Sequence, residues 1–127
     1  MKEVKQVWKG DLADYWFDED GVLHAFSKVA PRTIDSVKAN FDLVHHITHD
    51  QRVCVILDMT YTKPYSVETM KYLLHEFRYA YKAIAFVSRS PIGELVANIA
   101  MQLNPNGSPM SVFSNSGEAK EWIRQYL

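Results

Sequence analysis

The chain has 127 residues, of which 47% are hydrophobic and 23% are charged, and its formal net charge is -1. This size and composition predict one globular domain over residues 1–127, and exclude a disordered or fibrous chain. The small net charge does not favour nucleic acid or an anionic membrane surface as a partner. Because every apolar run is strand-sized and the first twenty residues lack a signal-like core, we expect a soluble, cytoplasmic protein with no integral membrane segment.

The chain opens with a predicted β-hairpin. Ala13–Phe17 and Val22–Ser27 are its strands, and Asp20-Gly21 supplies the positive φ that a tight turn requires. The preceding Val4–Trp8 either adds an edge strand or lies over the sheet. Pro31 is then predicted to start a helix, whose apolar positions recur at helical spacing. They are Ile34, Val37, Phe41 and Val44.

The centre of the chain reads as a β-α-β unit. Val53–Leu57 is an unbroken apolar run that stops at Asp58, and Ala83–Val87 is a second run of the same kind. Such runs are typical of parallel strands covered on both faces, so Val55 and Leu57 should face opposite to Cys54 and Ile56. Between them, Ser66 to about Tyr81 is a predicted helix. Its expected buried stripe is Val67, Met70, Leu73, Leu74 and Phe77.

The last third predicts a helix, a short strand and a helix. Ser90-Pro91 is a strong helix start, Met110–Phe113 is the strand, and the final helix begins near Ser116. The apolar stripes are Ile92, Leu95, Val96, Ile99 and Leu103 in the first helix and Ala119, Trp122, Ile123 and Tyr126 in the second. The order β-β-α-β-α-β-α-β-α predicts an α/β domain: a mixed sheet, opened by a hairpin, with about four helices packed on it.

Four segments together resemble a family of small, mostly uncharacterised bacterial proteins with the STAS-like fold. They are Tyr15–Leu23, Val55–Asp58, Ser88–Asn98 and Glu118–Ile123. The resemblance implies the fold of anti-sigma-factor antagonists, which is related in shape to SEC14-type lipid carriers. In those antagonists the loop after the central strand carries Asp-Ser-Ser/Thr-Gly, whose first serine is phosphorylated. Here the matching place reads Lys63-Pro64-Tyr65-Ser66-Val67-Glu68, with no Asp-Ser pair and no glycine.

Five polar residues are candidates for ligand or anion binding. Asp58 ends the central strand, where open α/β sheets bind ligands, but it can equally accept hydrogen bonds from the next loop. Ser88, Arg89 and Ser90 lie where free amides, hydroxyls and a guanidinium could hold an anion, unless Ser90 is only a helix cap. Ser66 begins the second helix. Without a glycine-rich loop we predict no cofactor.

Histidine and cysteine predict no metal centre. His45 and His49 are one helical turn apart and His46 lies between them, but two facing histidines are fewer than a full ligand set, so we expect a solvated face. The isolated His24 and His75 should be surface or internally bonded side chains. The one cysteine, Cys54, should be a buried, inert thiol.

The aromatic residues indicate a binding surface or ordinary core. Trp8, Trp16, Tyr61, Tyr65 and Tyr79 could line a pocket or meet a partner. Tyr72 and Tyr79 are expected to point away from the buried stripe, which favours self-association as a homodimer or a protein partner. We therefore predict a non-catalytic binding module that takes a protein partner or a small apolar, lipid-like ligand. The alternatives are a small enzyme using Asp58 with Ser88–Ser90, and a regulator phosphorylated at Ser66, Thr60 or Thr62.

Overall fold

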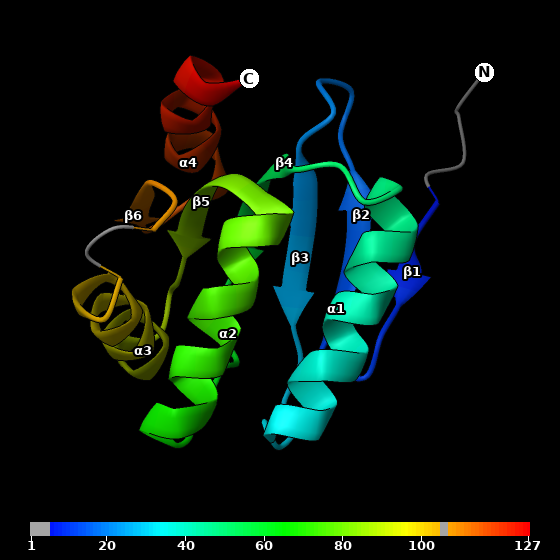
Figure 1. Ribbon diagram of the computed structural model, residues 1–127. Helices are drawn as coiled ribbons and strands as arrows, with labels where there is room; N and C mark the ends of the chain where they lie inside the picture. The colour runs from blue at the N-terminus through cyan, green and yellow to red at the C-terminus, as the bar shows by residue number, and fades with distance from the viewer. Residues whose placement is uncertain (1–5, 105–106) are drawn as a thin grey trace.

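The computed structural model describes residues 6–104 and 107–127 as an α/β domain with six strands and four α-helices (Figure 1). The elements are β1 (Trp8–Lys9), β2 (Ala13–Phe17), β3 (Leu23–Ser27), α1 (Ile34–Thr48), β4 (Val53–Asp58), α2 (Val67–Ala80), β5 (Tyr81–Val87), α3 (Pro91–Gln102), β6 (Met110–Phe113), α4 (Ser116–Ile123) and a closing 3-10 turn, Arg124–Tyr126. This order confirms the predicted α/β architecture.

The strands form one mixed sheet in the order β1-β2-β3-β4-β5-β6. β1, β2 and β3 are antiparallel neighbours, whereas β3, β4, β5 and β6 run parallel. Trp8 pairs with Tyr15, so the segment before the hairpin does add an edge strand, although Val4 lies outside the described residues. Gly21 has φ 79°, as expected at the hairpin tip.

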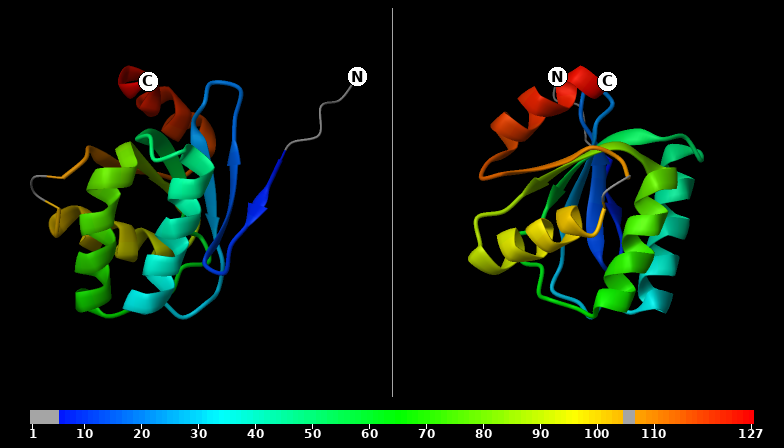
Figure 2. Two further views of the ribbon diagram at one scale, coloured as in Figure 1. Left: turned by 45° about the vertical axis from the view of Figure 1, so that its right-hand side comes forward. Right: turned by 60° about the vertical axis from the view of Figure 1, so that its left-hand side comes forward.

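The two faces of the sheet carry different layers (Figure 2). α1 and α2 cover one face, where Val55 joins a large cluster with Phe41, Phe77 and Phe86. α4 covers the other face, where Cys54 and Ile56 join a smaller cluster around Ile123. Leu57, half-buried, packs against the first cluster, so the predicted alternation along β4 is confirmed.

One predicted helix limit was wrong. Pro31 does not start α1: Thr33 is its N-cap and accepts from the Ser36 amide, while Ser36 bonds back to Thr33 in a capping box. The limit predicted for α2, about Tyr81, was confirmed: the helix ends at Ala80, and Tyr81 is its C-cap and the first residue of β5. The Tyr81 ring packs in the core beside Phe77.

The α3 stripe was largely wrong. Val96 is buried and Leu103 half-buried, but Ile92, Leu95 and Ile99 are exposed, as are Ile34 in α1 and Val67 in α2. α3 instead turns its small residues inward, and a Cβ placed on Gly93 would lie 2.2 Å from the Met59 carbonyl oxygen. This close approach brings the helix backbone against the loop after β4, which leaves the larger aliphatic side chains outside.

Candidate functional site

The Ser88–Ser90 turn directs its polar groups into internal hydrogen bonds. The Ser88 hydroxyl donates to the Ser90 carbonyl at 2.8 Å and accepts from the Ser90 amide. The Arg89 amide donates to Thr60 Oγ1, and Ser90 Oγ accepts from the Gly93 amide. An anion binding here would have to displace protein acceptors. Binding at this turn stays a prediction, and these contacts count against it.

Asp58 pairs in the sheet with Val87, the residue before Ser88, but its carboxylate bonds to the loop that follows it. Its Oδ1 accepts from the Thr60 amide at 2.9 Å, which is the structural role that the sequence allowed. It lines a depression of about 300 Å³ on the α4 face, together with Trp16, Phe26 and Ser116. Neither Ser66 nor any residue of the Ser88–Ser90 turn lines this depression. The five residues therefore do not line this depression together.

The hydroxyls proposed for phosphorylation differ in access. Ser66 is exposed and caps α2, where its oxygen accepts from the Thr69 amide at 3.1 Å. Thr62 is buried, with only 3% of its surface exposed. Of these two, only Ser66 offers its hydroxyl to a kinase, and its phosphorylation stays a prediction.

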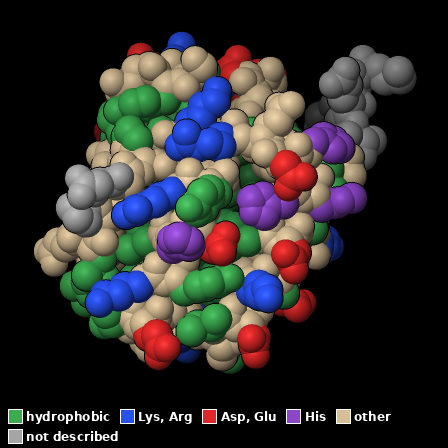
Figure 3. Space-filling model, viewed as in Figure 1, with side chains coloured by type: hydrophobic (Ala, Val, Ile, Leu, Met, Phe, Trp, Pro, Cys, Tyr) green, Lys and Arg blue, Asp and Glu red, His purple; other side chains and the backbone are tan. Residues whose placement is uncertain are grey.

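The histidines of α1 lie on the surface around the end of that helix, and Figure 3 shows histidine side chains gathered there. His45 Nδ1 lies 3.6 Å from Asp50 Oδ1. Within residues 6–104 and 107–127 no three His, Cys, Asp or Glu side chains are placed to hold a metal ion together. No helix in this part of the chain is both long and apolar enough to cross a membrane.

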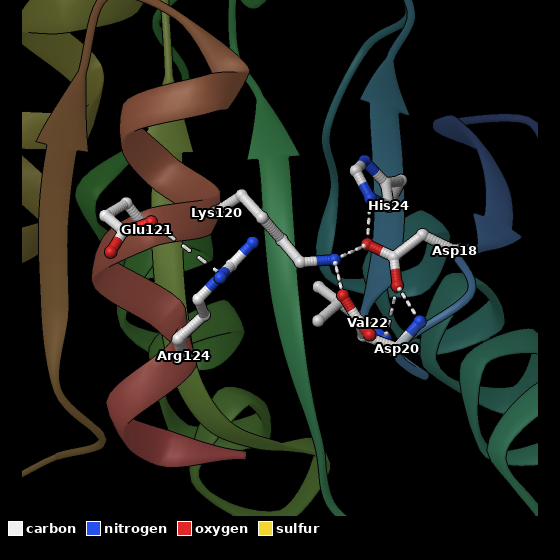
Figure 4. Close-up of polar contacts among 7 residues, drawn as sticks. All are labelled: Asp18, Asp20, Val22, His24, Lys120, Glu121 and Arg124. Atoms are coloured by element: carbon white, nitrogen blue, oxygen red, sulfur yellow. Dashed lines mark hydrogen bonds and ion pairs between the residues drawn. The ribbon is translucent and has the colours of Figure 1, made fainter.

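The hairpin is tied to α4 by a cluster of charges (Figure 4). Lys120 Nζ donates to Asp18 Oδ2 at 2.5 Å and lies 2.9 Å from Asp20 Oδ2. His24 Nε2 is 2.9 Å from Asp18 Oδ2, and Asp18 Oδ1 accepts the amides of Asp20 and Val22. We call Asp18, Asp20, His24 and Lys120 the hairpin ion cluster. His24 is thus internally bonded, as expected for an isolated histidine.

The charge balance of this cluster shows in the pKa of Asp18. Partial burial alone would raise it, but the hydrogen bonds from Lys120, His24 and two backbone amides outweigh burial and lower the pKa to about 2. Burial correspondingly lowers the pKa of Lys120, but its bonds to Asp18 and Asp20 raise it overall. Each charge in the cluster is compensated within the chain, which is typical of a structural contact.

A cavity of a different kind lies between the sheet and α1 and α2. We call it the inner cavity; its volume is about 50 Å³. Its wall is mostly apolar and includes Leu57, Phe77 and Phe86. Tyr15 and Asn40 also line it and are hydrogen-bonded to each other at 2.7–3.0 Å. The cavity therefore offers a small apolar space whose polar wall groups are already paired.

Arg32 and Tyr65 form a wall that the inner cavity shares with a depression at the surface. Both residues line the inner cavity and also an open depression of about 300 Å³, which we call the outer depression. Its other lining residues are Val29, Ala30, Pro31, Lys63 and Pro64. These belong to the loops that follow β3 and β4, at the bottom of Figure 1, where α1 and α2 begin. This is the carboxyl edge of the parallel strands, where ligands of α/β sheets bind.

Arg32 is held at this junction by backbone carbonyls. Nη1 donates to the carbonyls of Lys28 and Ala30, both at 2.7 Å, and Nη2 donates to that of Leu12 at 3.1 Å. Burial lowers the pKa of Arg32. Among the described residues no carboxylate lies within ion-pair distance of this guanidinium. The chain therefore orients Arg32 without neutralising its charge.

The phenols around the inner cavity stay neutral. Burial raises the pKa of Tyr15 and of Tyr65 to about 12, and raises that of Tyr81 well above its usual value. Tyr65 donates to Met70 Sδ rather than to a charged group. Neither a phenolate nor a carboxylate from these walls opposes the charge of Arg32 near neutral pH.

The predicted interface tyrosines are placed differently from each other. Tyr79 is 60% exposed, and its ring lies against His75. Tyr72 is half-buried and packs against the main core cluster, so the expectation that it points away from the core was wrong. The more apolar exposed surface is on α3, where Ile92 and Leu95 are 51% and 55% exposed. Figure 3 shows hydrophobic side chains gathered over that helix.

Residues 15–127 match the sequence profile of DUF7793, a domain family of unknown function. This chain belongs to the DUF7793 family. A crystal structure from Shewanella loihica PV-4, described as an uncharacterized DUF3478 protein with a SpoIIAA-like fold, is similar with a TM-score of 0.55. The alignment covers 94% of this chain and 92% of that one, at 13% identity. At this identity the likeness shows the fold, and it confirms the STAS-like resemblance. Among proteins of curated function, none matches this chain significantly in sequence.

In this DUF7793 domain, sequence reasoning missed Arg32. An arginine just before a helix reads as solvated surface, because nothing nearby in the sequence shows that Leu12 will supply one of its acceptors. Tyr65 was recognised only as one of several aromatics that could line a pocket. The signal that could have joined them is topological: both residues lie in loops that follow parallel strands, β3 and β4.

Proposed function

We propose that this DUF7793 domain is a non-catalytic binding module that takes a small apolar ligand in the inner cavity. The observation that supports it is that only side chains such as Arg32 and Tyr65, which line both hollows, stand between the apolar inner cavity and the outer depression. An apolar ligand would enter between the loops after β3 and β4 and replace weakly held water or empty space. The inner cavity, at about 50 Å³, admits a slender chain end, so a longer ligand requires α1 and α2 to separate slightly.

Binding accounts for this site better than catalysis does. The polar side chains of the inner cavity include buried phenols with raised pKa, a paired amide and a guanidinium. None of these is a nucleophile activated by a base, which acyl or phosphoryl transfer would require. Asp58, the carboxylate of the rival enzyme hypothesis, lines the depression on the opposite face of the sheet.

The test is a titration with 1-octanol, followed by backbone amide shifts. Ser27 lines the inner cavity and is buried, so Ser27→Val should fill part of the space and weaken binding. Ser111→Val, a half-buried position of β6 that does not line the cavity, is the matched control. We expect saturable shifts along the cavity walls in the wild type and in Ser111→Val, and weaker binding in Ser27→Val. No shifts at the cavity walls in the wild type would disprove the proposal.

A second candidate function is binding to a protein through α3. Ile92, Leu95 and Ile99 recur at helical spacing, and each is at least 36% exposed. Three exposed aliphatic side chains on one helix are more than scattered surface residues require, and they fit a helix-packing partner or a second copy of the chain. Tyr79 and Tyr72 remain predicted contacts of a protein interface, although the half-buried Tyr72 also packs against the main core cluster.

A further inference from the structure

We propose that the ligand of the inner cavity carries an anionic head group, a carboxylate or phosphate, which binds Arg32 at the cavity entrance. This inference rests on the proposed function, because it places an apolar tail in the same inner cavity. It adds the chemical class of the ligand: a small anionic amphiphile, with its head in the outer depression and its tail inside.

The first support is the charge of Arg32. Its guanidinium lines both the inner cavity and the outer depression, and its partners among the described residues are carbonyl oxygens. Carbonyls orient a cation but leave its unit charge in place. A half-buried charge without a counter-ion is costly, and an anion arriving from solution removes that cost.

The second support is the set of donors that Arg32 has left. A guanidinium has five N–H donors. Both hydrogens of Nη1 and one of Nη2 are used by the carbonyls of Lys28, Ala30 and Leu12. One hydrogen on Nη2 and the hydrogen on Nε remain. Donors on neighbouring guanidinium nitrogens match the two oxygens of a carboxylate or phosphate group.

The third support is the composition of the outer depression. Lys63 supplies a second cationic side chain there, and no acidic residue is among the residues that line it. Val29, Pro31 and Pro64 make the rest of the rim mostly apolar. An anionic head with an apolar neighbour therefore finds complementary charge and complementary surface in one place.

The rival explanation is that Arg32 is only a clamp, which ties the loop after β3 to Leu12. A clamp predicts no preference for charge in the ligand. The two explanations are separated by probes of equal chain length and different head group, measured on the wild-type protein. No variant is needed for this comparison, so a folding defect cannot obscure it.

The experiment compares octanoate, 1-octanol, octyl phosphate and acetate in amide-shift titrations at pH 7. We expect octanoate or octyl phosphate to bind at least about tenfold more tightly than 1-octanol, and acetate to bind far more weakly because it lacks the tail. Equal affinity for octanoate, octyl phosphate and 1-octanol would overturn the anionic head group and leave the proposed function intact. Failure of all three octyl probes to bind would overturn the proposed function itself.

Variants then assign the preference to one side chain. Arg32→Met should abolish the preference for octanoate over 1-octanol, and Arg32→Lys should restore only part of it, because an ammonium lacks the paired donors. Lys120→Met, a cation on the other side of the sheet, is the matched control and should keep the full preference. An unchanged preference in a folded Arg32→Met protein would contradict the role given to Arg32.

Discussion

Lys120 and Arg32 are both partly buried cations, but only the charge of Lys120 is compensated by carboxylates. Lys120 lies 2.5 Å from Asp18 and 2.9 Å from Asp20, so two carboxylates compensate its charge. Arg32 donates only to backbone carbonyls and has no carboxylate partner among the described residues. A charge compensated inside the chain contributes to stability, whereas one that is oriented but uncompensated is available to a ligand.

The two cations also differ in what surrounds them. Lys120 comes from α4, which packs on the smaller cluster and closes against the hairpin. Arg32 lines the inner cavity beside the larger cluster, and with Tyr65 it also lines the outer depression. Removing the partners of Lys120 should therefore lower the free energy of unfolding. Removing Arg32 should mainly reduce the preference for an anionic ligand.

The largest expected effect is that of Asp18→Ala on stability. The substitution removes the acceptor of Lys120, His24 and the amides of Asp20 and Val22. Lys120 keeps Asp20 as a partner, but His24 and the two amides lose theirs, so the free energy of unfolding should fall by about 3 kcal/mol. Urea denaturation at pH 7 measures it.

Asp18→Asn is the matched control for that loss. Its amide oxygen can still accept the hairpin amides of Asp20 and Val22, so it should lose about half as much stability. Equal stability of the wild type and Asp18→Ala would show that the hairpin ion cluster contributes nothing, and would remove one side of the comparison.

The next effect is the pH dependence of stability below pH 4. The pKa of Asp18 falls from an ordinary 3.8 to about 2 in the folded protein, so folding favours the ionised carboxylate. Its contribution, about 2 kcal/mol, is present above the unfolded pKa and is lost as pH falls towards 2. The stability difference between wild type and Asp18→Asn should therefore shrink over this range. A difference that stays constant from pH 6 to pH 2 would mean that the carboxylate charge is not what stabilises the cluster.

The sequence predicted the scaffold because its signals are local. The apolar run Val53–Leu57, the Asp20-Gly21 turn and the Ser90-Pro91 cap each act over a few residues, and each was confirmed. The orientation of α3 could not be predicted, because it depends on the contact of Gly93 with the Met59 carbonyl, 34 residues away in sequence. A periodic apolar stripe shows that a helix is amphipathic, but small residues at the same spacing can be the buried side.

The candidate site was predicted least well, for the same reason. Arg32 donates a hydrogen bond to the Leu12 carbonyl and shares the cavity wall with Tyr65. Both contacts depend on the folded topology. Asp58 ends its strand as expected, but the twofold alternation of β4 places it on the α4 face, away from the inner cavity. The sequence therefore pointed to Asp58, which resembles part of a known motif, but not to the uncompensated charge of Arg32.

A smaller effect is expected for Arg32→Met on stability. The side chain ties one loop to the Leu12 carbonyl, but that carbonyl also accepts from the Lys28 amide, and the Ala30 carbonyl belongs to a residue that lines the open depression, where it can bond to water. We expect the free energy of unfolding to fall by about 1 kcal/mol, clearly less than for Asp18→Ala. Urea denaturation of both variants under one condition gives the ranking. A loss larger than that of Asp18→Ala would make Arg32 the main structural cation and reverse the comparison.

The smallest effect on stability should come from the α3 surface, which neither cation touches. Leu95 is 55% exposed, so Leu95→Ser should change the free energy of unfolding by no more than about 0.5 kcal/mol. If α3 binds a second copy of the chain, sedimentation of the wild type should show a dimer that Leu95→Ser weakens, since the same helix contributes twice in a symmetric pair. Glu94→Gln, at the neighbouring exposed position, keeps the apolar stripe and should keep the dimer. A wild type that is monomeric at every concentration would rule out self-association through α3, and the contrast between Arg32 and Lys120 would stand without it.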